Sequence, residues 1–447
     1  MTHLFLRDVE VGGVRQHVAI ADGRIVAIGP DLPQRGDAID GQGGALIPGL
    51  HDHHIHLLAT AAAADSIDLS DATDLAAVAA RIAAIAALRP PGSWLRATHC
   101  PAPVAERLDR HALDRIAPRH RLRILDRTGA LWILNGPALA SVGDIAALER
   151  EAGGDATGRL WRGDAALRAA IGTVLPPLAP LGEQLARYGI TAVTDTSVTT
   201  DPSAAAALTG AMPQRLTLMS GGPLIAPAGG GFAVGAVKVV PDERDPPSLD
   251  DFIARIAQAR KWGRAVAVHC VTAFELALTL AAFAEHGARP GDRIEHGGVI
   301  PPAAIGEIAA MGLTVVTQPG FIAARGDRYL REVDPADRDD LYRCASLIAA
   351  GVPVLGSSDA PYGPLDPWLA MRTAVHRETA GGQRIGEGER IAPAQALGLY
   401  LERPALSVGM VANLCLLDVG LAQALTDLDA RHVAATLIAG RIIWKSN

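Results

Sequence analysis

Hydrophobic and polar positions alternate over short segments at both ends of the chain. Two apolar runs flank Asp22-Gly23, and an Asp-Gly pair between such runs is typical of a β-hairpin. Residues 412–418 and 434–444 have a similar strand-like pattern. We therefore expect residues 1–47 and 405–447 to meet in one small β-sandwich domain.

Between these ends, apolar segments of strand length alternate with alanine-rich segments of helical length. This alternation is typical of βαβ units on a parallel sheet. The predicted strands are 45–50, 94–99, 123–125, 190–194, 216–219, 236–240, 265–269, 293–296, 314–317 and 354–356. The predicted helices include 74–88, 249–262, 273–286, 302–311 and 337–350. About eight βα units predict an α/β fold, a (β/α)8 TIM-like barrel over residues 48–404. A segment rich in glycine and proline around 136–180 is expected as an insertion.

Four of the chain's 14 histidines lie between positions 51 and 56, directly after an apolar run. Successive side chains on a strand point to opposite faces, so His54 and His56 point the same way, as metal chelation requires. A lone His-x-His motif consists of surface or hydrogen-bonded histidines about as often as it consists of metal ligands. The interpretation depends on whether later strands end in the same chemistry.

Later strands do end in such residues. His269 and His296 each end a predicted strand, and Asp359 follows another. Any one of them alone is more often a cap or a hydrogen-bond partner. The reacting groups of a parallel barrel lie at the carboxyl ends of its strands. Together with His54 and His56, these three residues therefore predict a metal centre.

Composition excludes several classes of protein. The net charge of −7 leaves no basic surface for nucleic acid. No signal sequence is recognised, and no apolar run reaches the roughly 20 residues that span a bilayer, so we expect a cytoplasmic protein without a membrane partner. The four cysteines are far apart, which indicates neither a disulfide framework nor a thiolate zinc site.

Lys238 is unusual because only three of the chain's 41 basic residues are lysine. It lies inside an apolar strand, where a charged group is costly. A salt bridge is the ordinary explanation. A buried lysine, unlike arginine, can lose its proton, and the neutral amine can take up CO2 to become a carbamate. Given the histidines, we favour a carbamate on Lys238 that bridges two metal ions.

These motifs occur in the order found along the barrel of the amidohydrolase superfamily, which the chain resembles over almost its whole length. The motifs are Pro48-Gly49 through His56, the strand lysine Lys238, Val268-His269, Arg293-Ile294-Glu295-His296 and Gly356-Ser357-Ser358-Asp359-Ala360-Pro361. Further segments resemble the branch that contains N-substituted formamide deformylases, amidohydrolase family 3. These are Asp126-Arg127-Thr128-Gly129-Ala130, Thr194-Asp195 and Pro364-Leu365-Asp366-Pro367-Trp368.

The resemblance implies a metal-dependent hydrolase, most simply with two zinc ions, that cleaves a non-peptide C–N bond such as an amide or a formamide. His54 and His56 are then expected to hold one ion with Asp359, while His269 and His296 hold the second. Carboxylated Lys238 bridges the two, and Asp359 moves the proton of the attacking water. The expected catalytic residues are Asp359, Lys238 and His296.

Two alternatives stay open. The first is a centre with one metal ion, in which His296 or Lys238 transfers a proton and the enzyme is a deaminase or a lyase. The second is a catalytically inactive barrel that serves as an assembly scaffold. The branch usually has Ser-Gly-His where this chain has Thr128-Gly129-Ala130, so the substrate is left undetermined. We expect a small molecule, a possible homodimer, and pocket walls from loops after the strands. The substrate-binding candidates are His99, Thr128, Arg325 and Tyr362.

Overall fold

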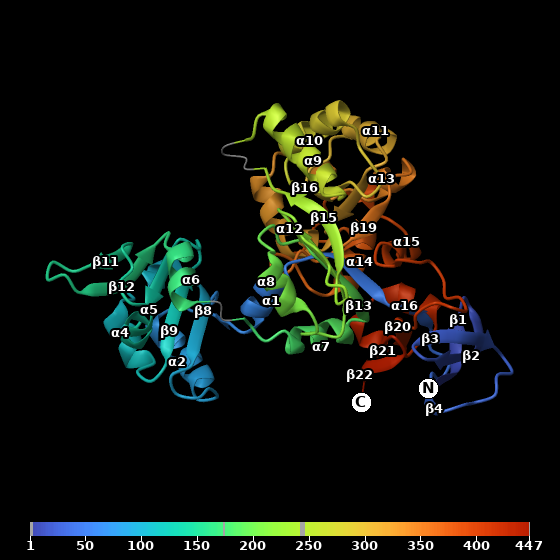
Figure 1. Ribbon diagram of the computed structural model, residues 1–447, viewed down its shortest axis with the longest axis horizontal. Coiled ribbons are helices and arrows are strands. Elements are labelled where there is room, and N and C mark those ends of the chain that lie inside the picture. Colours follow the sequence, from blue (N-terminus) through green and yellow to red (C-terminus); the bar gives the residue numbers. More distant parts are fainter. Residues whose placement is uncertain (1–2, 173–174, 242–245, 447) are drawn as a thin grey trace. The chain divides into compact units, whose positions relative to one another are not determined.

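The structure, a computed structural model, describes residues 3–172, 175–241 and 246–446. The chain divides into two compact units. The first contains residues 1–60 and 178–447, and the second contains residues 61–177. Figure 1 labels the elements of both units.

The first unit contains a sheet of eight parallel strands, in the order β19-β18-β17-β16-β15-β14-β13-β6. They are β6 Leu50–Ile55, β13 Ile190–Asp195, β14 Arg215–Ser220, β15 Ala233–Val239, β16 Val266–Cys270, β17 Arg293–His296, β18 Thr314–Thr317 and β19 Val354–Gly356. The carboxyl end of β6 is joined to the segment that follows β19, where the Asp359 amide donates to the His54 carbonyl (2.8 Å) and the His56 amide to the Ala360 carbonyl (3.0 Å). The predicted (β/α)8 barrel is confirmed.

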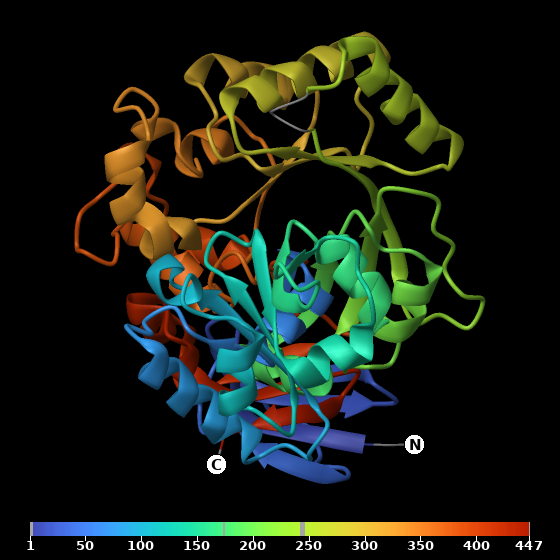
Figure 2. The same ribbon diagram turned by 90° about the vertical axis from the view of Figure 1, so that its left-hand side faces the viewer.

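Helices cover the outside of this barrel, and Figure 2 shows the yellow and orange ones around the strands. The helices of this unit are α1 Leu57–Ala64, which continues into the second unit, α7 Ala179–Arg187, α8 Pro202–Leu208, α9 Leu249–Lys261, α10 Ala273–His286, α11 Pro302–Ala310, α12 Gly320–Glu332, α13 Ala345–Ala349, α14 Pro367–His376, α15 Pro393–Gly398 and α16 Leu421–Asp427. Local sequence explains where several begin. Ser248 caps α9, and Thr272 with Glu275 forms a capping box at α10.

Both ends of the chain contribute to a β-sandwich in the same unit. One sheet has the order β3-β2-β1-β4 and the other β22-β21-β20-β5. The strands are β1 His3–Val11, β2 Val14–Ala21, β3 Arg24–Gly29, β4 Asp37–Asp40, β5 Leu46–Pro48, β20 Leu414–Leu417, β21 Val433–Ile438 and β22 Arg441–Lys445. Their inward side chains share one core, which includes Leu6, Ile25, Leu414 and Leu437.

The chain forms two strands, β5 and β6, where one strand over residues 45–50 was expected. β5 pairs with β20 in the sandwich, whereas the next strand, β6, belongs to the barrel. Gly49 separates them, and its amide donates to the Asn413 carbonyl at 2.9 Å. A Cβ on Gly49 would lie 2.3 Å from the Thr191 side chain, so the turn requires a glycine. The histidines consequently lie within the barrel strand and just after it.

The second unit is larger than the insertion expected around 136–180. Its sheet has the order β11-β12-β10-β9-β8-β7, with helices on both faces. Its elements are β7 Ile67–Asp68, α2 Leu75–Ala86, β8 Trp94–Cys100, α3 Ala102–Ala105, α4 Arg110–Ile116, β9 Arg121–Asp126, β10 Leu131–Leu134, α5 Gly136–Val142, β11 Leu148–Arg150, β12 Ala156–Trp161 and α6 Asp164–Ile171. The runs 94–99 and 123–125, expected in the barrel, are strands of this sheet instead. An apolar run predicts a buried strand but does not specify the sheet to which it belongs.

Candidate metal centre

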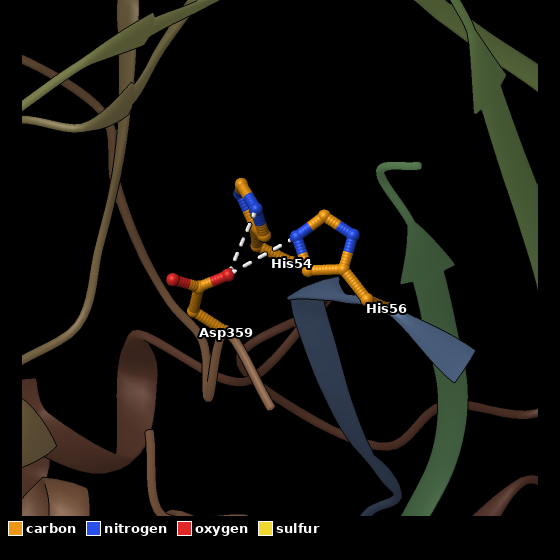
Figure 3. Close-up of side chains that lie close together, drawn as sticks. All are labelled: His54, His56 and Asp359. Atoms are coloured by element: carbon orange, nitrogen blue, oxygen red, sulfur yellow. Dashed lines mark ion pairs between the residues drawn. The ribbon is translucent and has the colours of Figure 1, made fainter. Parts of the chain in front are cut away.

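Three side chains meet at the carboxyl ends of the barrel strands, His54, His56 and Asp359. One nitrogen of each ring and one carboxylate oxygen lie within 4.8 Å of one another. Asp359 Oδ1 is 3.4 Å from His54 Nε2 and 3.3 Å from His56 Nε2. Figure 3 shows both rings facing this one oxygen. Two imidazoles and a carboxylate are donors that suit zinc, manganese or iron.

The backbone places Asp359 opposite the histidines. The hydrogen bond from the Asp359 amide to the His54 carbonyl fixes it beside β6. Asp359 has φ 52°, and His296, another strand-end residue, has φ 71°. Residues other than glycine adopt this left-handed conformation at a cost, and such residues cluster at functional sites. The local backbone therefore supports a functional role for both.

Unpartnered buried atoms show that the site fits a cation. His54 Nε2, Asp359 Oδ1 and Lys238 Nζ are buried and make no hydrogen bond among the described residues. A buried polar atom without a partner costs free energy, which a bound ion would offset. Burial tends to raise the pKa of Asp359, but the adjacent His54 and His56 hold it well below its usual value. The carboxylate is therefore ionised and can bind a cation.

Neighbouring groups orient both imidazoles. His54 Nδ1 pairs with the Glu295 carboxylate, while His56 Nδ1 lies 3.2 Å from Ser197 Oγ. A carboxylate only accepts, so His54 donates from Nδ1 to Glu295 and its Nε2 faces Asp359. Such partners commonly fix the tautomer of a metal-binding histidine.

Glu295 was not among the residues predicted for the site. Its side chain is fully buried and also pairs with Arg293, whose guanidinium donates to the His53 carbonyl at 2.8 Å. Burial tends to raise the pKa of Glu295, but Arg293, Lys238 and His54 hold it well below its usual value. The only signal in the sequence was a Glu next to His296 in the Arg-Ile-Glu-His motif, and it did not reveal the partner on β6.

Lys238, His269 and His296 line the same cavity as His56 and Asp359. The His296 ring centroid is 4.6 Å from that of His54 and 4.5 Å from that of His269. Burial lowers the pKa of His269 to about 4 and that of His296 well below its usual value. Burial also lowers the pKa of Lys238, although Glu295 and Asp359 oppose this effect. The two imidazoles are therefore neutral near pH 7, as metal ligands must be.

Comparison with known proteins identifies the family. Residues 37–444 match the model of the amidohydrolase family. The chain belongs to this family. An N-substituted formamide deformylase from Arthrobacter pascens is 26% identical over 488 aligned positions, which cover 90% of each chain. The fold resembles uncharacterized metal-dependent hydrolases from Pyrococcus horikoshii OT3 (TM-score 0.77, 18% identity, 99% of this chain and 100% of that one) and Pyrococcus furiosus (TM-score 0.73, 18% identity, 93% and 99%).

The predicted family is thus confirmed, and with it the class of reaction. The protein is a metal-dependent amidohydrolase, an enzyme that hydrolyses carbon–nitrogen bonds other than peptide bonds. Within the described residues, no helix has both the length and the apolar character needed to cross a bilayer.

A cavity of about 930 Å³ opens at the candidate metal centre of this amidohydrolase. His56, Lys238, His269, His296 and Asp359 form its polar floor. Arg325 and Tyr362, two of the predicted substrate-binding residues, also line it. The Tyr362 ring lies edge-on to His56, with the ring centroids 5.6 Å apart. A small molecule in the cavity would therefore contact the centre directly.

The other two predicted substrate-binding residues, His99 and Thr128, belong to the second unit. His99 is exposed, and its Nδ1 is 3.1 Å from Asp68 Oδ1. Thr128 Oγ1 donates to Asp126 Oδ2 at 2.6 Å, within the turn between β9 and β10. Both side chains thus have local structural partners. Their role in substrate binding stays a prediction.

Proposed function

We propose that this amidohydrolase uses two zinc ions to hydrolyse an amide or a formamide of a small molecule. The observation that carries the proposal is the convergence of His54, His56 and Asp359 beside the unpartnered amine of Lys238. His54, His56 and Asp359 would hold one ion, and His269 with His296 the other. A bound divalent ion lowers the pKa of a water molecule and polarises a carbonyl group.

Asp359 is proposed as the group that moves the proton. Its carboxylate lies on the cavity floor and is held ionised by the adjacent histidines. It can therefore accept a proton from the attacking water and deliver it to the leaving nitrogen. The protonated nitrogen then departs as an amine rather than as an amide anion.

Lys238 is proposed to carry a carbamate. Its buried amine has a lowered pKa, so the neutral form is accessible. Attack of Nζ on the carbon of CO2 forms the N–C bond while one C=O π bond breaks, and the nitrogen releases a proton to water. The product has two oxygens that share one negative charge, so each oxygen could bind one cation. Burial of an unpaired ammonium would instead be unfavourable.

Metal analysis of the purified protein tests this proposal. We expect about two zinc ions per chain and, after growth with 13C-labelled bicarbonate, a carbamate carbon signal that is absent from Lys238→Ala. One ion per chain with a free amine would favour the mononuclear deaminase or lyase instead. Failure to bind any divalent ion would favour the inactive scaffold.

Substrate screening completes the test. The metal-loaded protein is expected to release amine or acid from members of a panel of N-formyl and N-acyl compounds. If the metal-loaded protein turned over no compound of the panel, this result would contradict the proposed reaction. A cytoplasmic location, a homodimer and the absence of a nucleic-acid partner stay predictions, the homodimer testable by light scattering.

A further inference from the structure

Arg325 is a cation held in place on the wall of the active-site cavity. It belongs to α12 and is partly buried. Its guanidinium carbon lies 4.4 Å from the centroid of the Phe321 ring, and one of its nitrogens donates to the Tyr362 carbonyl. Stacking and a hydrogen bond orient the planar group, so less freedom is lost when it binds a ligand.

The positive charge of Arg325 has no acidic partner among the residues that the structure describes. Within the described part of the chain, Arg325 pairs with no carboxylate, whereas its neighbour Arg328 pairs with Glu332 at 2.5 Å. A guanidinium stays protonated at all ordinary pH values. Its remaining N–H donors match the two oxygens of a carboxylate. An oriented, unneutralised arginine in a cavity therefore favours an anionic ligand.

The same part of the cavity has an aromatic wall. Three of the chain's five tyrosines line it, Tyr329, Tyr342 and Tyr362, together with Phe321. Aromatic residues make up only 4% of the sequence, so their concentration here is notable. The hydroxyl groups of Tyr329 and Tyr342 lie 3.1 Å apart and partner each other. The rings are thus available as apolar contact surface.

We infer that Arg325 binds a carboxylate of the substrate while the aromatic wall holds an apolar group. The substrate class is then an N-acyl amine that carries both a carboxylate and an apolar side chain, as in an N-formyl or N-acyl aromatic amino acid. This inference rests on the proposed hydrolysis of amides or formamides. It adds a recognition site that is separate from the metal ligands.

A matched pair of compounds tests the inference. N-formylphenylalanine, as both enantiomers, and N-formyl-2-phenylethylamine share the scissile bond and the ring, but only the former has a carboxylate. We expect kcat/KM for the carboxylate compound to exceed that for the neutral one by about tenfold or more, from the strength of a charge-assisted hydrogen bond. Arg325→Met should abolish this preference, mainly through KM, and Arg325→Lys should restore part of it.

Arg331→Met is the matched control, because Arg331 is an exposed arginine of the same helix whose side chain bonds to the Asp327 carbonyl. It should leave the preference unchanged. If Arg325 only positioned Tyr362, Arg325→Met would reduce turnover of both compounds equally. That result would overturn the inference while leaving the proposed hydrolysis intact.

A binding measurement separates the inference from the proposed reaction. Titration calorimetry with 3-phenylpropionate and 3-phenylpropionamide needs no turnover. In proteins of equal metal content, the carboxylate should bind about tenfold more tightly or better to the wild type, and this advantage should disappear in Arg325→Met. If the carboxylate bound more tightly only when Arg325 was present, but no N-acyl compound was hydrolysed, the result would contradict the proposed reaction and leave the inference intact. An advantage that persists in Arg325→Met would overturn the inference.

Discussion

At the scale of single residues, the chemistry of the candidate centre depends on the atoms that surround the amine of Lys238. Lys238 Nζ has no hydrogen-bond partner in the described part of the chain, although Glu295 and Asp359 lie close enough to favour its charged form. A salt bridge would normally provide a contact to one of these carboxylates, and none is present among the described residues. This favours the carbamate over the salt bridge.

Substitution of Lys238 distinguishes the two interpretations. If a carbamate bridges two ions, Lys238→Arg should be as damaging as Lys238→Ala, because arginine supplies no anionic bridge. Added acetate or propionate should restore part of the metal content and activity in Lys238→Ala only, by filling the space left. The salt-bridge interpretation predicts the reverse order. A Lys238→Arg protein with two ions and full activity would contradict the binuclear model.

Glu295 contacts the candidate centre through His54 Nδ1. Glu295→Gln keeps the shape of the side chain but allows the amide to present either a donor or an acceptor to His54 Nδ1. Loss of such a partner typically weakens metal affinity about 10- to 100-fold. We expect this loss in a competition titration with a metal-binding dye. Unchanged affinity would mean that the hydrogen bond does not orient His54.

At the scale of elements, Arg377 fastens the segment that carries Tyr342 to the end of α14. Its side chain is fully buried and donates to the carbonyls of Leu341 (2.6 Å), Tyr342 (2.9 Å) and Ile385 (2.9 Å). These bonds satisfy carbonyl groups of two segments outside the regular strands, one on each side of α14 in the sequence. The guanidinium thus holds part of the cavity wall in place.

Arg377→Met should therefore be strongly destabilising. It removes the guanidinium donor of three buried carbonyls, and among the described residues only Tyr342 keeps a weak contact, from the Cys344 thiol at 3.8 Å. Each such loss costs about 1–3 kcal/mol, so we expect a decrease of about 3 kcal/mol or more in the free energy of unfolding. Chemical denaturation measures it. Arg384→Met is the control, because Arg384 is half-exposed and pairs with Glu378 on the surface, where ion pairs contribute about 0–1 kcal/mol. Equal effects in the two variants would refute this role of Arg377.

At the scale of the whole molecule, the sequence predicted the barrel because its strands are buried apolar runs that end in His269, His296 or Asp359. It did not predict that the similar runs 94–99 and 123–125 belong to a second sheet, since hydrophobic pattern does not encode strand partners. Glu295 was missed for a related reason. Its partner His54 is 241 positions away in the sequence, and only the closed barrel brings them together.

The distribution of the candidate ligands over the barrel predicts how metal affects stability. They come from β6, β15, β16, β17 and the loop after β19, so the set exists only when the first unit is folded. An ion that binds only the folded state stabilises it by about 4 kcal/mol at a free concentration 1,000 times its dissociation constant. Chelation should thus lower the unfolding temperature of the first unit, and added zinc should restore it.

The second unit supplies an internal control. Residues 61–177 have their own cores and none of the candidate metal ligands. Differential scanning calorimetry of the intact chain should therefore show two transitions, of which only the one from the first unit shifts with metal. His54→Ala should remove the shift, because it deletes a ligand on the strand that completes the barrel. Two results would contradict this prediction. Chelation could leave the temperatures of both transitions unchanged, or it could lower both equally.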